Sequence, residues 1–202
     1  MEEASIYQAY LQGALHDGTW AAAHRTHRIS QQGTIWLRLL QQILAELGHN
    51  AWLYQEGKSR DVYVLETSAR FLDIDFDPDR LTSDKARQGY VRGYFDAEGG
   101  LPRSAHVRFY IQFSQKDREE LDKVKAILKS TGIACGETHN PSRRVDSEYW
   151  RFYIRARSHG EFVRQIGSWH PRKIETIRTL MPEAAFSLQY PIEPPQEWEI
   201  AH

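Results

Sequence analysis

The sequence contains an internal repeat, which is the feature that most limits the folds open to this chain. Ser30-Gln31 and Ser114-Gln115 lie 84 residues apart, and each pair is followed by an amphipathic segment that ends at a glycine, Gly48 or Gly132. Apolar residues recur in both segments at helical spacing, and each glycine stands where a helix C-terminus favours a left-handed residue. The apolar positions are Leu37, Leu40, Ile43, Leu44 and Leu47 in the first copy and Leu121, Val124, Ile127 and Leu128 in the second. The repeat predicts two halves of similar fold.

Strand-like runs flank both predicted helices. One run precedes each Ser-Gln pair, at 19–30 and 104–114, and two follow each helix, at 52–57 and 61–67 in the first half and at 135–139 and 148–158 in the second. In 104–114, Val107, Phe109, Ile111 and Phe113 alternate with polar residues, which predicts one apolar and one hydrogen-bonding face. A short helical stretch closes each half, around 69–72 and 160–166. The pattern predicts an α+β fold of two pseudo-symmetric α-β-β-α-β-β-α units.

Each half opens with a segment that combines small residues and a terminal acid. The segments are 4–18, with Gly13 and Ala14, and 83–100, with Gly89 and Gly93. A glycine inside a helix costs about 1 kcal/mol relative to alanine, so we expect two helices that pack backbone against backbone. An acid at a helix C-terminus faces the negative end of the dipole, so we also expect a positive group nearby. The predicted units are 1–80, 81–181 and an acidic, proline-containing tail at 182–202.

Composition limits the class of protein. The only cysteine among the 202 residues is Cys135, so the chain has no intrachain disulfide and no cysteine-based zinc cluster. No basic leader and no run of about 20 apolar residues is present, which predicts an intracellular protein of the cytoplasm or an organellar matrix without a membrane partner. The formal net charge is −1, but residues 100–181 hold 16 Lys and Arg against 9 Asp and Glu. The acids concentrate elsewhere, so part of the surface can be basic.

These motifs resemble a known family. The string RGYFDAEGG at 92–100 is similar to the LAGLIDADG motif of the LAGLIDADG homing endonucleases, and YLQGALHDG at 10–18 is a weaker first copy. The repeat, the Ser-Gln pairs and SWHPRK at 168–173 extend the resemblance over about residues 5–181. It implies a single-chain, two-motif protein, a monomer with internal pseudo-twofold symmetry. The motif helices would pack at its centre, and two antiparallel sheets would form a saddle on double-stranded DNA.

The resemblance also implies a catalytic centre. The last acid of each motif would bind Mg²⁺, or another divalent cation such as Mn²⁺ or Ca²⁺, and these acids map to Glu98 and Asp17. The first motif is one residue short, because Glu98 is five residues after Gly93 whereas Asp17 is only four after Gly13. Gln31 and Gln115 match the polar residues that orient solvent, and Lys85 and Lys173 match the basic residue before the next helix. We interpret His16 as a packing or capping residue and Asp96 as a structural acid.

Side chains on the polar strand faces would contact base edges in the major groove of the DNA. The candidates that the resemblance implies are His24, Thr26 and Arg28 in the first half and His106, Arg108, Tyr110, Gln112, Arg151, Tyr153 and Arg155 in the second.

The sequence is compatible with three functions. The leading hypothesis is a site-specific double-strand DNA endonuclease that hydrolyses phosphodiesters with divalent metal. The second is a related protein without nuclease activity that binds DNA or intron RNA, as a maturase or regulator. The third is a small-molecule enzyme that uses histidines, which is disfavoured because the histidines lack metal-ligand spacing.

Overall fold

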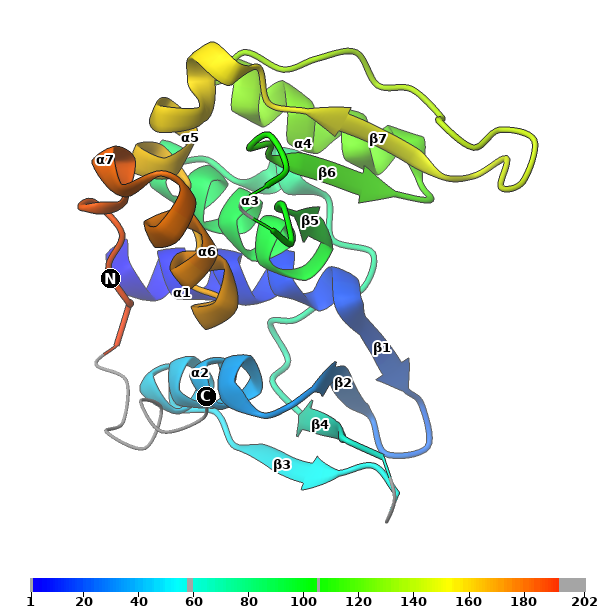
Figure 1. The fold of residues 1–202 in the computed structure, drawn as a ribbon. Coiled ribbons are helices and arrows are strands. Elements are labelled where there is room, and N and C mark those ends of the chain that lie inside the picture. Colours follow the sequence, from blue (N-terminus) through cyan, green and yellow to red (C-terminus); the bar gives the residue numbers. More distant parts are fainter. Residues whose placement is uncertain (1, 58–59, 105, 193–202) are drawn as a thin grey trace.

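Two helices that touch along their backbones form the centre of the molecule. The computed structural model describes residues 2–57, 60–104 and 106–192, and Figure 1 shows α1 (Glu2–Ala14) beside α3 (Asp84–Glu98), between the two halves. A Cβ atom on Gly13 would overlap the Tyr90 carbonyl and lie 2.7 Å from the Tyr94 nitrogen, and one on Gly93 would overlap the Tyr10 carbonyl and lie 2.8 Å from the Ala14 nitrogen. The predicted backbone-to-backbone contact of the motif helices is therefore confirmed.

The first half continues from α1 through a 3₁₀ turn, η1 (Leu15–Asp17), into a four-stranded antiparallel sheet. Its strands are β1 (Gly18–Ala21), β2 (Thr26–Gln32), β3 (Ala51–Gln55) and β4 (Val62–Thr67), in the order β1-β2-β4-β3. One face of this sheet packs on α2 (Ile35–Glu46), where Leu37, Leu40 and Ile43 are fully buried. A segment with a 3₁₀ turn, η2 (Pro78–Arg80), leads to α3.

The second half has a three-stranded antiparallel sheet in the order β5-β6-β7. The strands are β5 (Gly99–Gly100), β6 (Gln112–Gln115) and β7 (Trp150–Tyr153), and Phe113 of β6 stacks on Phe152 of β7 in the core. The helices are α4 (Arg118–Ser130), η3 (Ala156–Ser158), α5 (His159–Gln165), α6 (Pro171–Leu180) and α7 (Pro182–Ala185). In Figure 1 the sheet of the first half lies below the α1–α3 pair and that of the second half above it, and α6 and α7 lie on the left, toward the N-terminal end of α1.

The predicted repeat is confirmed for the helix of each half that follows the Ser-Gln pair. α2 and α4 follow β2 and β6, and the helices are followed by Gly48 and Gly132 with φ values of 77° and 82°. The backbone nitrogens of His49 and Ile133 donate to the carbonyls of Leu44 and Leu128, 2.8 and 3.0 Å away, which closes the same C-terminal motif in both copies.

Several predicted elements are corrected by the structure. Residues 19–30 form two strands joined by a tight turn, in which the His24 nitrogen donates to the Ala21 carbonyl. The sequence does not predict this turn, because it lacks the glycine or proline that marks most turns. Residues 69–72 form a turn instead of a helix, so the first unit lacks its closing helix. Residues 106–111 are not paired as a strand, and Val107 is 51% exposed. Residues 135–139 make only isolated bridges to β7 and to Ile154.

The chain after residue 181 packs on the rest of the molecule where it is described. α7 and Leu188 join the core of the second half, and the Tyr7 hydroxyl donates to the Pro191 carbonyl. The remainder of the predicted acidic tail, residues 193–202, lies outside the described residues. Among the described helices none is long and apolar enough to cross a membrane.

Asp96 connects the central helices to the C-terminal segment. This side chain is 3% exposed, and its carboxylate accepts hydrogen bonds from the Tyr10 hydroxyl at 2.7 Å and from the nitrogens of Trp169 and His170 at 2.9 and 3.0 Å. Ser168 donates a further bond. Burial raises the pKa of Asp96, opposed chiefly by the charge of Lys173. The interpretation of Asp96 as a structural acid agrees with this geometry.

Replacing Gly93 by alanine tests the helix contact. The new methyl group would overlap backbone atoms of α1 that cannot move independently, so we expect Gly93→Ala to lower the free energy of unfolding by about 1–3 kcal/mol or more. Gly160→Ala in α5 is the matched control, since its Cβ would meet only the Arg164 side chain at 3.4 Å and alanine favours a helix. Urea denaturation measures both, and equal stability of the two variants would refute the contact.

Removing the Asp96 carboxylate should be more damaging than removing one of its donors. Asp96→Ala leaves the buried Tyr10 hydroxyl and Trp169 nitrogen without their acceptor and weakens the bonding of Ser168 and His170, so we expect a loss of about 3–5 kcal/mol in unfolding free energy. Tyr10→Phe removes a single donor to Asp96 and should cost less than Asp96→Ala when measured by the same denaturation. The reverse order would contradict the assigned role of Asp96.

Candidate active site

The two motif helices bring Asp17 and Glu98 together. Both acids are half-buried at the same end of the α1–α3 pair, at the points where β1 and β5 begin. Burial raises the pKa of Glu98, and the charge of Asp17 adds to this effect, so the two carboxylates act on one another electrostatically. The glycines that follow, Gly18 and Gly99, have extended backbones, and a Cβ on either would collide with Leu15 or Phe95. The glycine after each acid is therefore required by close contact with the preceding helical turn.

The first motif compensates for its missing residue by a change of helix type. From Gly13 to Asp17 the chain makes one α-helical step and three 3₁₀ steps, and from Gly93 to Glu98 it makes five α-helical steps. With rises of about 2.0 and 1.5 Å per residue, both paths advance about 7.5 Å, and they rotate by about 460° and about 500°. Asp17 thus reaches a level equivalent to that of Glu98. Sequence spacing could not show this, because 3₁₀ and α-helical turns share residue preferences.

Each acid has a glutamine from the adjoining strand. Gln31 at the end of β2 donates a side-chain hydrogen bond to Asp17, and Gln115 at the end of β6 interacts with Glu98 and lowers its pKa. The two pairs come from equivalent places in the repeat. The structure therefore places Gln31 and Gln115 beside the acids that the resemblance assigned to them.

Burial dominates the electrostatics of the pair. It raises the pKa of Asp17 to about 6, against the hydrogen bond from Gln31 and the charge of Lys173. It also raises the pKa of Glu98, with the charge of Asp17 adding to the effect and those of His16 and Lys173 opposing it. Two partly desolvated carboxylates side by side carry negative charge that the surrounding side chains do not balance, and a cation would relieve it.

Lys173 is the positive group expected at the end of α3. Its ammonium donates to the carbonyls of Asp96 at 3.0 Å and Gly99 at 2.7 Å, and also to that of Phe95. Burial lowers its pKa to about 8, although Asp96, Glu98 and Asp17 favour the charged form. Lys173 thus caps the negative end of the helix and faces both acids.

Lys85 is not brought to this site. It lies in the first turn of α3, and Glu98 is the last residue of that helix. The two are separated by about 20 Å along a straight α-helix. The match of Lys85 to the family pattern rested on its place before a helix, which gives no information on which end of that helix meets the acids.

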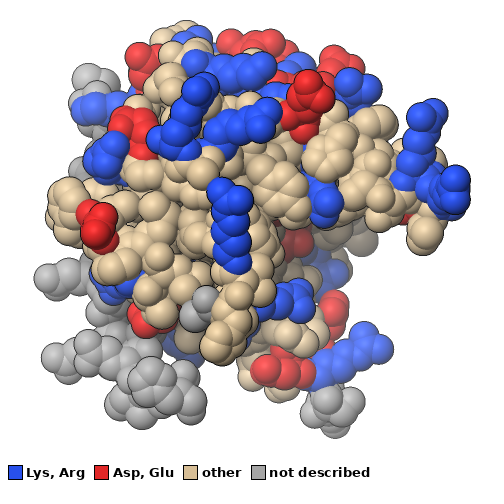
Figure 2. Space-filling model, turned by 45° about the horizontal axis from the view of Figure 1, so that its top comes forward, with Lys and Arg blue, Asp and Glu red and all other residues tan. Residues whose placement is uncertain are grey.

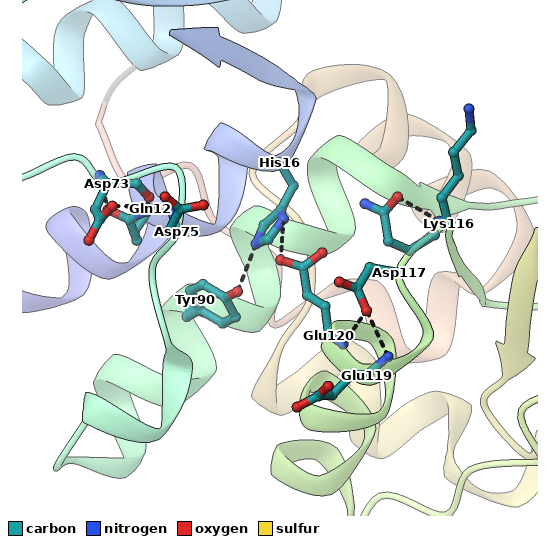
Figure 3. A network of polar contacts seen from close by, with 10 residues as sticks. Gln12, His16, Asp73, Asp75, Tyr90, Lys116, Asp117, Glu119 and Glu120 are labelled. Carbon is teal, nitrogen blue, oxygen red and sulfur yellow. Dashed lines mark hydrogen bonds and ion pairs between the residues drawn. The ribbon is translucent and has the colours of Figure 1, made fainter. Parts of the chain in front are cut away.

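His16 joins the two halves next to Asp17. Figure 3 shows its ring between Tyr90 and Glu120, with Nε2 2.7 Å from the Tyr90 hydroxyl and Nδ1 3.0 Å from a Glu120 oxygen. Glu120 lies in the first turn of α4, whose N-terminus is capped by Asp117. The interpretation of His16 as a packing residue agrees with these contacts, whereas its predicted alternative as a helix cap does not describe them. Among the described residues no cluster of three or more His, Cys, Asp or Glu has the geometry of a metal site.

The outer face of the first sheet carries a connected polar network. Glu66 accepts a hydrogen bond from Thr26 on Oε1 at 2.5 Å and one from Tyr54 on Oε2 at 2.7 Å, and Arg28 Nε lies 3.9 Å from Oε2. Arg28 pairs with Glu66 across the strands, so both are on the face opposite α2. His24 is exposed in the turn before β2. Glu66 and Tyr54 were not among the predicted residues, because only the strand register places them beside Thr26 and Arg28.

The second sheet presents a similar face. The cross-strand pairs Gln112–Tyr153 and Ser114–Arg151 alternate with the buried pair Phe113–Phe152. Tyr110 contacts the Tyr153 ring edge to face, and Arg151 lies over that ring. Arg155 follows β7 and is exposed, as are His106 and Arg108 in the unpaired segment before β6.

Basic side chains are prominent over the second half. Figure 2 shows Lys and Arg spread across the face that the second half presents in this view, with fewer Asp and Glu among them. This distribution agrees with the excess of 16 basic over 9 acidic residues in 100–181.

The similarity to known proteins is strongest for the second half and extends over the fold. Residues 85–167 match the family model of the LAGLIDADG-like domain. The structure of I-DmoI in complex with DNA and Mn has a TM-score of 0.60 and 20% identity, over 81% of this chain and 97% of that chain. Mesophilic variants of the homing endonuclease I-DmoI give 0.63 and 18%, over 82% and 97%.

A further solved structure shares the fold. Full-length DUF199/WhiA from Thermatoga maritima gives a TM-score of 0.63 at 17% identity, over 90% of this chain and 61% of that chain. No protein with curated annotation matches the sequence. The chain thus contains a LAGLIDADG-like domain at residues 85–167 and has, over most of its length, the fold of the LAGLIDADG homing endonucleases.

Proposed function

We propose that this chain is a site-specific endonuclease that cuts both strands of duplex DNA with a divalent metal ion. The observation that carries the proposal is the pairing of Asp17 with Glu98, one from each half, each with a glutamine from the adjoining strand. The resemblance to I-DmoI, which has been solved with its target DNA in the presence of Mg and with Mn and Ca, supports the nucleic-acid partner and the metal. The fold alone does not distinguish a nuclease from a DNA-binding relative, since DUF199/WhiA shares it.

The residues present suit a hard divalent cation. Asp17 and Glu98 offer carboxylate oxygens, and burial raises the pKa of both, a cost to their charged forms that a bound cation would offset. With only two protein carboxylates, the remaining ligands would be water and phosphate oxygens, as Mg²⁺ prefers. When bound, the metal would activate water for attack on phosphorus and stabilise the leaving 3′ oxygen. Mg²⁺ is the proposed ion, with Mn²⁺ or Ca²⁺ as the other candidates.

The other residues of the site would position the reacting groups. Gln31 and Gln115 hold the carboxylates and offer amide groups to solvent at the scissile phosphates. Lys173 adds positive charge beside both acids, which favours the phosphorane that forms during displacement. Lys85 has no part in this site. The polar faces of the two sheets, with Arg28 in one and Arg151 and Tyr153 in the other, would contact the duplex on either side.

Removing either acid should abolish cleavage and leave DNA binding intact. Stabilisation by a bound metal is worth several kcal/mol, so we expect Glu98→Gln and Asp17→Asn each to slow cleavage at least about 100-fold. The measurement is double-strand cleavage of a randomised duplex library with Mg²⁺, followed by the rate on the selected target. Asp84→Asn is the matched control, because it removes an exposed acid from the opposite end of α3.

Two results would contradict the proposal. One is that the wild-type protein cuts no sequence in the library with any of the three metals. The other is that Glu98→Gln cuts as fast as Asp84→Asn. Binding of duplex DNA or of intron RNA without cleavage would instead favour the alternative of an inactive relative.

A further inference from the structure

A pocket on the first half has a lining unlike the rest of the surface. It has a volume of about 510 Å³ and lies beneath the turn between β1 and β2, closed on the other side by residues 68–72 after β4. Trp20, His27, Arg25 and Arg70 contribute to its wall, together with His24, and no acid does. A volume of this size suits a small molecule.

The pocket opens on the helix side of the sheet, away from Arg28 and the strand face proposed for duplex DNA, and His24, a predicted DNA contact, is placed in its wall. Side chains alternate along a strand, so His27 and Ile29 share one face of β2 while Arg28 lies on the other. Ile29 is buried against α2, which identifies the face of His27 as the helix side. Trp20 pairs with His27 across the strands and therefore lies on the same side.

His27 is a buried polar side chain with an unsatisfied atom. It is 7% exposed, and its Nδ1 has no hydrogen-bond partner among the described residues. The ring interacts with the backbone of Leu72, so the other nitrogen holds the proton and Nδ1 is left as an acceptor. Buried polar atoms in native proteins are usually paired, so an unpaired acceptor in the wall of a pocket indicates a donor that arrives with a ligand.

Trp20 offers an aromatic surface next to that acceptor. Its indole packs on His27 with ring centroids 4.7 Å apart, yet 48% of the residue is exposed. Stacking of a base on an aromatic side chain stabilises bound nucleotides in a way that tolerates any base. A base stacked on Trp20 would lie beside His27, where an exocyclic amine of the base could donate a hydrogen bond to Nδ1.

Two arginines supply the positive charge. Arg25 and Arg70 are exposed at the pocket, and among the described residues neither forms an ion pair. Arg25 also has a φ of 54°, a conformation that a non-glycine residue rarely adopts. Free guanidinium groups bind phosphate through several hydrogen bonds.

We infer that this pocket binds a nucleoside 5′-phosphate, with the base on Trp20 beside His27 and the phosphate on Arg25 and Arg70. The ligand is either a free nucleotide or one unpaired nucleotide of a single strand. Because the pocket faces away from Arg28 and Glu66, it can be filled while duplex DNA lies on the strand face.

The test measures binding of two probes to the full chain. Adenosine 5′-monophosphate is followed by calorimetry, and a fluorescein-labelled single-stranded RNA of ten adenosines by anisotropy. We expect saturable binding, weakened about tenfold or more by Trp20→Ala. Arg25→Gly should weaken it similarly while relaxing the positive φ, so that its effect cannot come from a loss of folding.

The first sheet supplies the control. Trp52 is 52% exposed and lies on the strand face, since it pairs with Glu66, so Trp52→Ala should bind both probes as the wild type does. Trp20→Ala should leave duplex DNA binding unchanged, which separates this inference from the proposed nuclease function. Binding of the RNA but not of the mononucleotide would identify a single strand as the source, and equal binding would identify a free nucleotide.

Three results would overturn the inference. They are the absence of saturable binding of both probes, an equal loss of binding in Trp52→Ala and Trp20→Ala, and displacement of the mononucleotide by inorganic phosphate at the same concentration. The last result would mean that the pocket holds an anion and makes no use of the base.

Discussion

The backbone contact between α1 and α3 determines most of what lies around it. Because Gly13 and Gly93 lack side chains, each helix fits against the other at the level of Tyr90 and Tyr10, and this fixes both the separation and the relative height of the two helix ends. The ends carry Asp17 and Glu98, and β1 and β5 start immediately after them. A looser contact would separate the carboxylates and the two sheets together. The packing of two glycines is thus the basis of both the fold and the candidate active site.

The three acids at the end of the motif helices differ in the partners that the rest of the chain supplies. At the end of α3 the Lys173 ammonium binds three carbonyls, those of Phe95, Asp96 and Gly99, and the Asp96 carboxylate accepts hydrogen bonds from four donors. Asp17 and Glu98 have only glutamines and more distant cations, while burial raises the pKa values of all three acids. The hydrogen bonds therefore separate Asp96, a structural carboxylate with four donors, from the pair proposed to bind a metal.

Much of the fold and of the candidate active site could be predicted from the sequence. The repeat combines helical periodicity with glycines at helix C-termini and inside the motif helices, where only a glycine suits the backbone or the packing. α2, α4, the motif helices and the grouping of Asp17, Glu98, Gln31, Gln115 and Lys173 follow from it and from the family resemblance. The turn at 22–25 was missed because it has no glycine, and the closing helix at 69–72 was wrongly expected because a few apolar residues do not determine their conformation. Lys85 was misplaced, and Glu66 was overlooked, since sequence spacing gives neither the direction of a helix relative to the site nor the register of a sheet.

Lys173 gives the chain a property that concerns its synthesis. The carbonyls that it binds belong to residues made some 75 positions earlier, and the Ser168–His170 segment that binds Asp96 is almost as late. A nascent chain that ends before this point can pair its motif helices, yet the negative end of α3 would lack its cation and Asp96 would lack three of its donors. The order of translation would therefore leave the surroundings of the two acids unfinished until nearly the whole protein has been made.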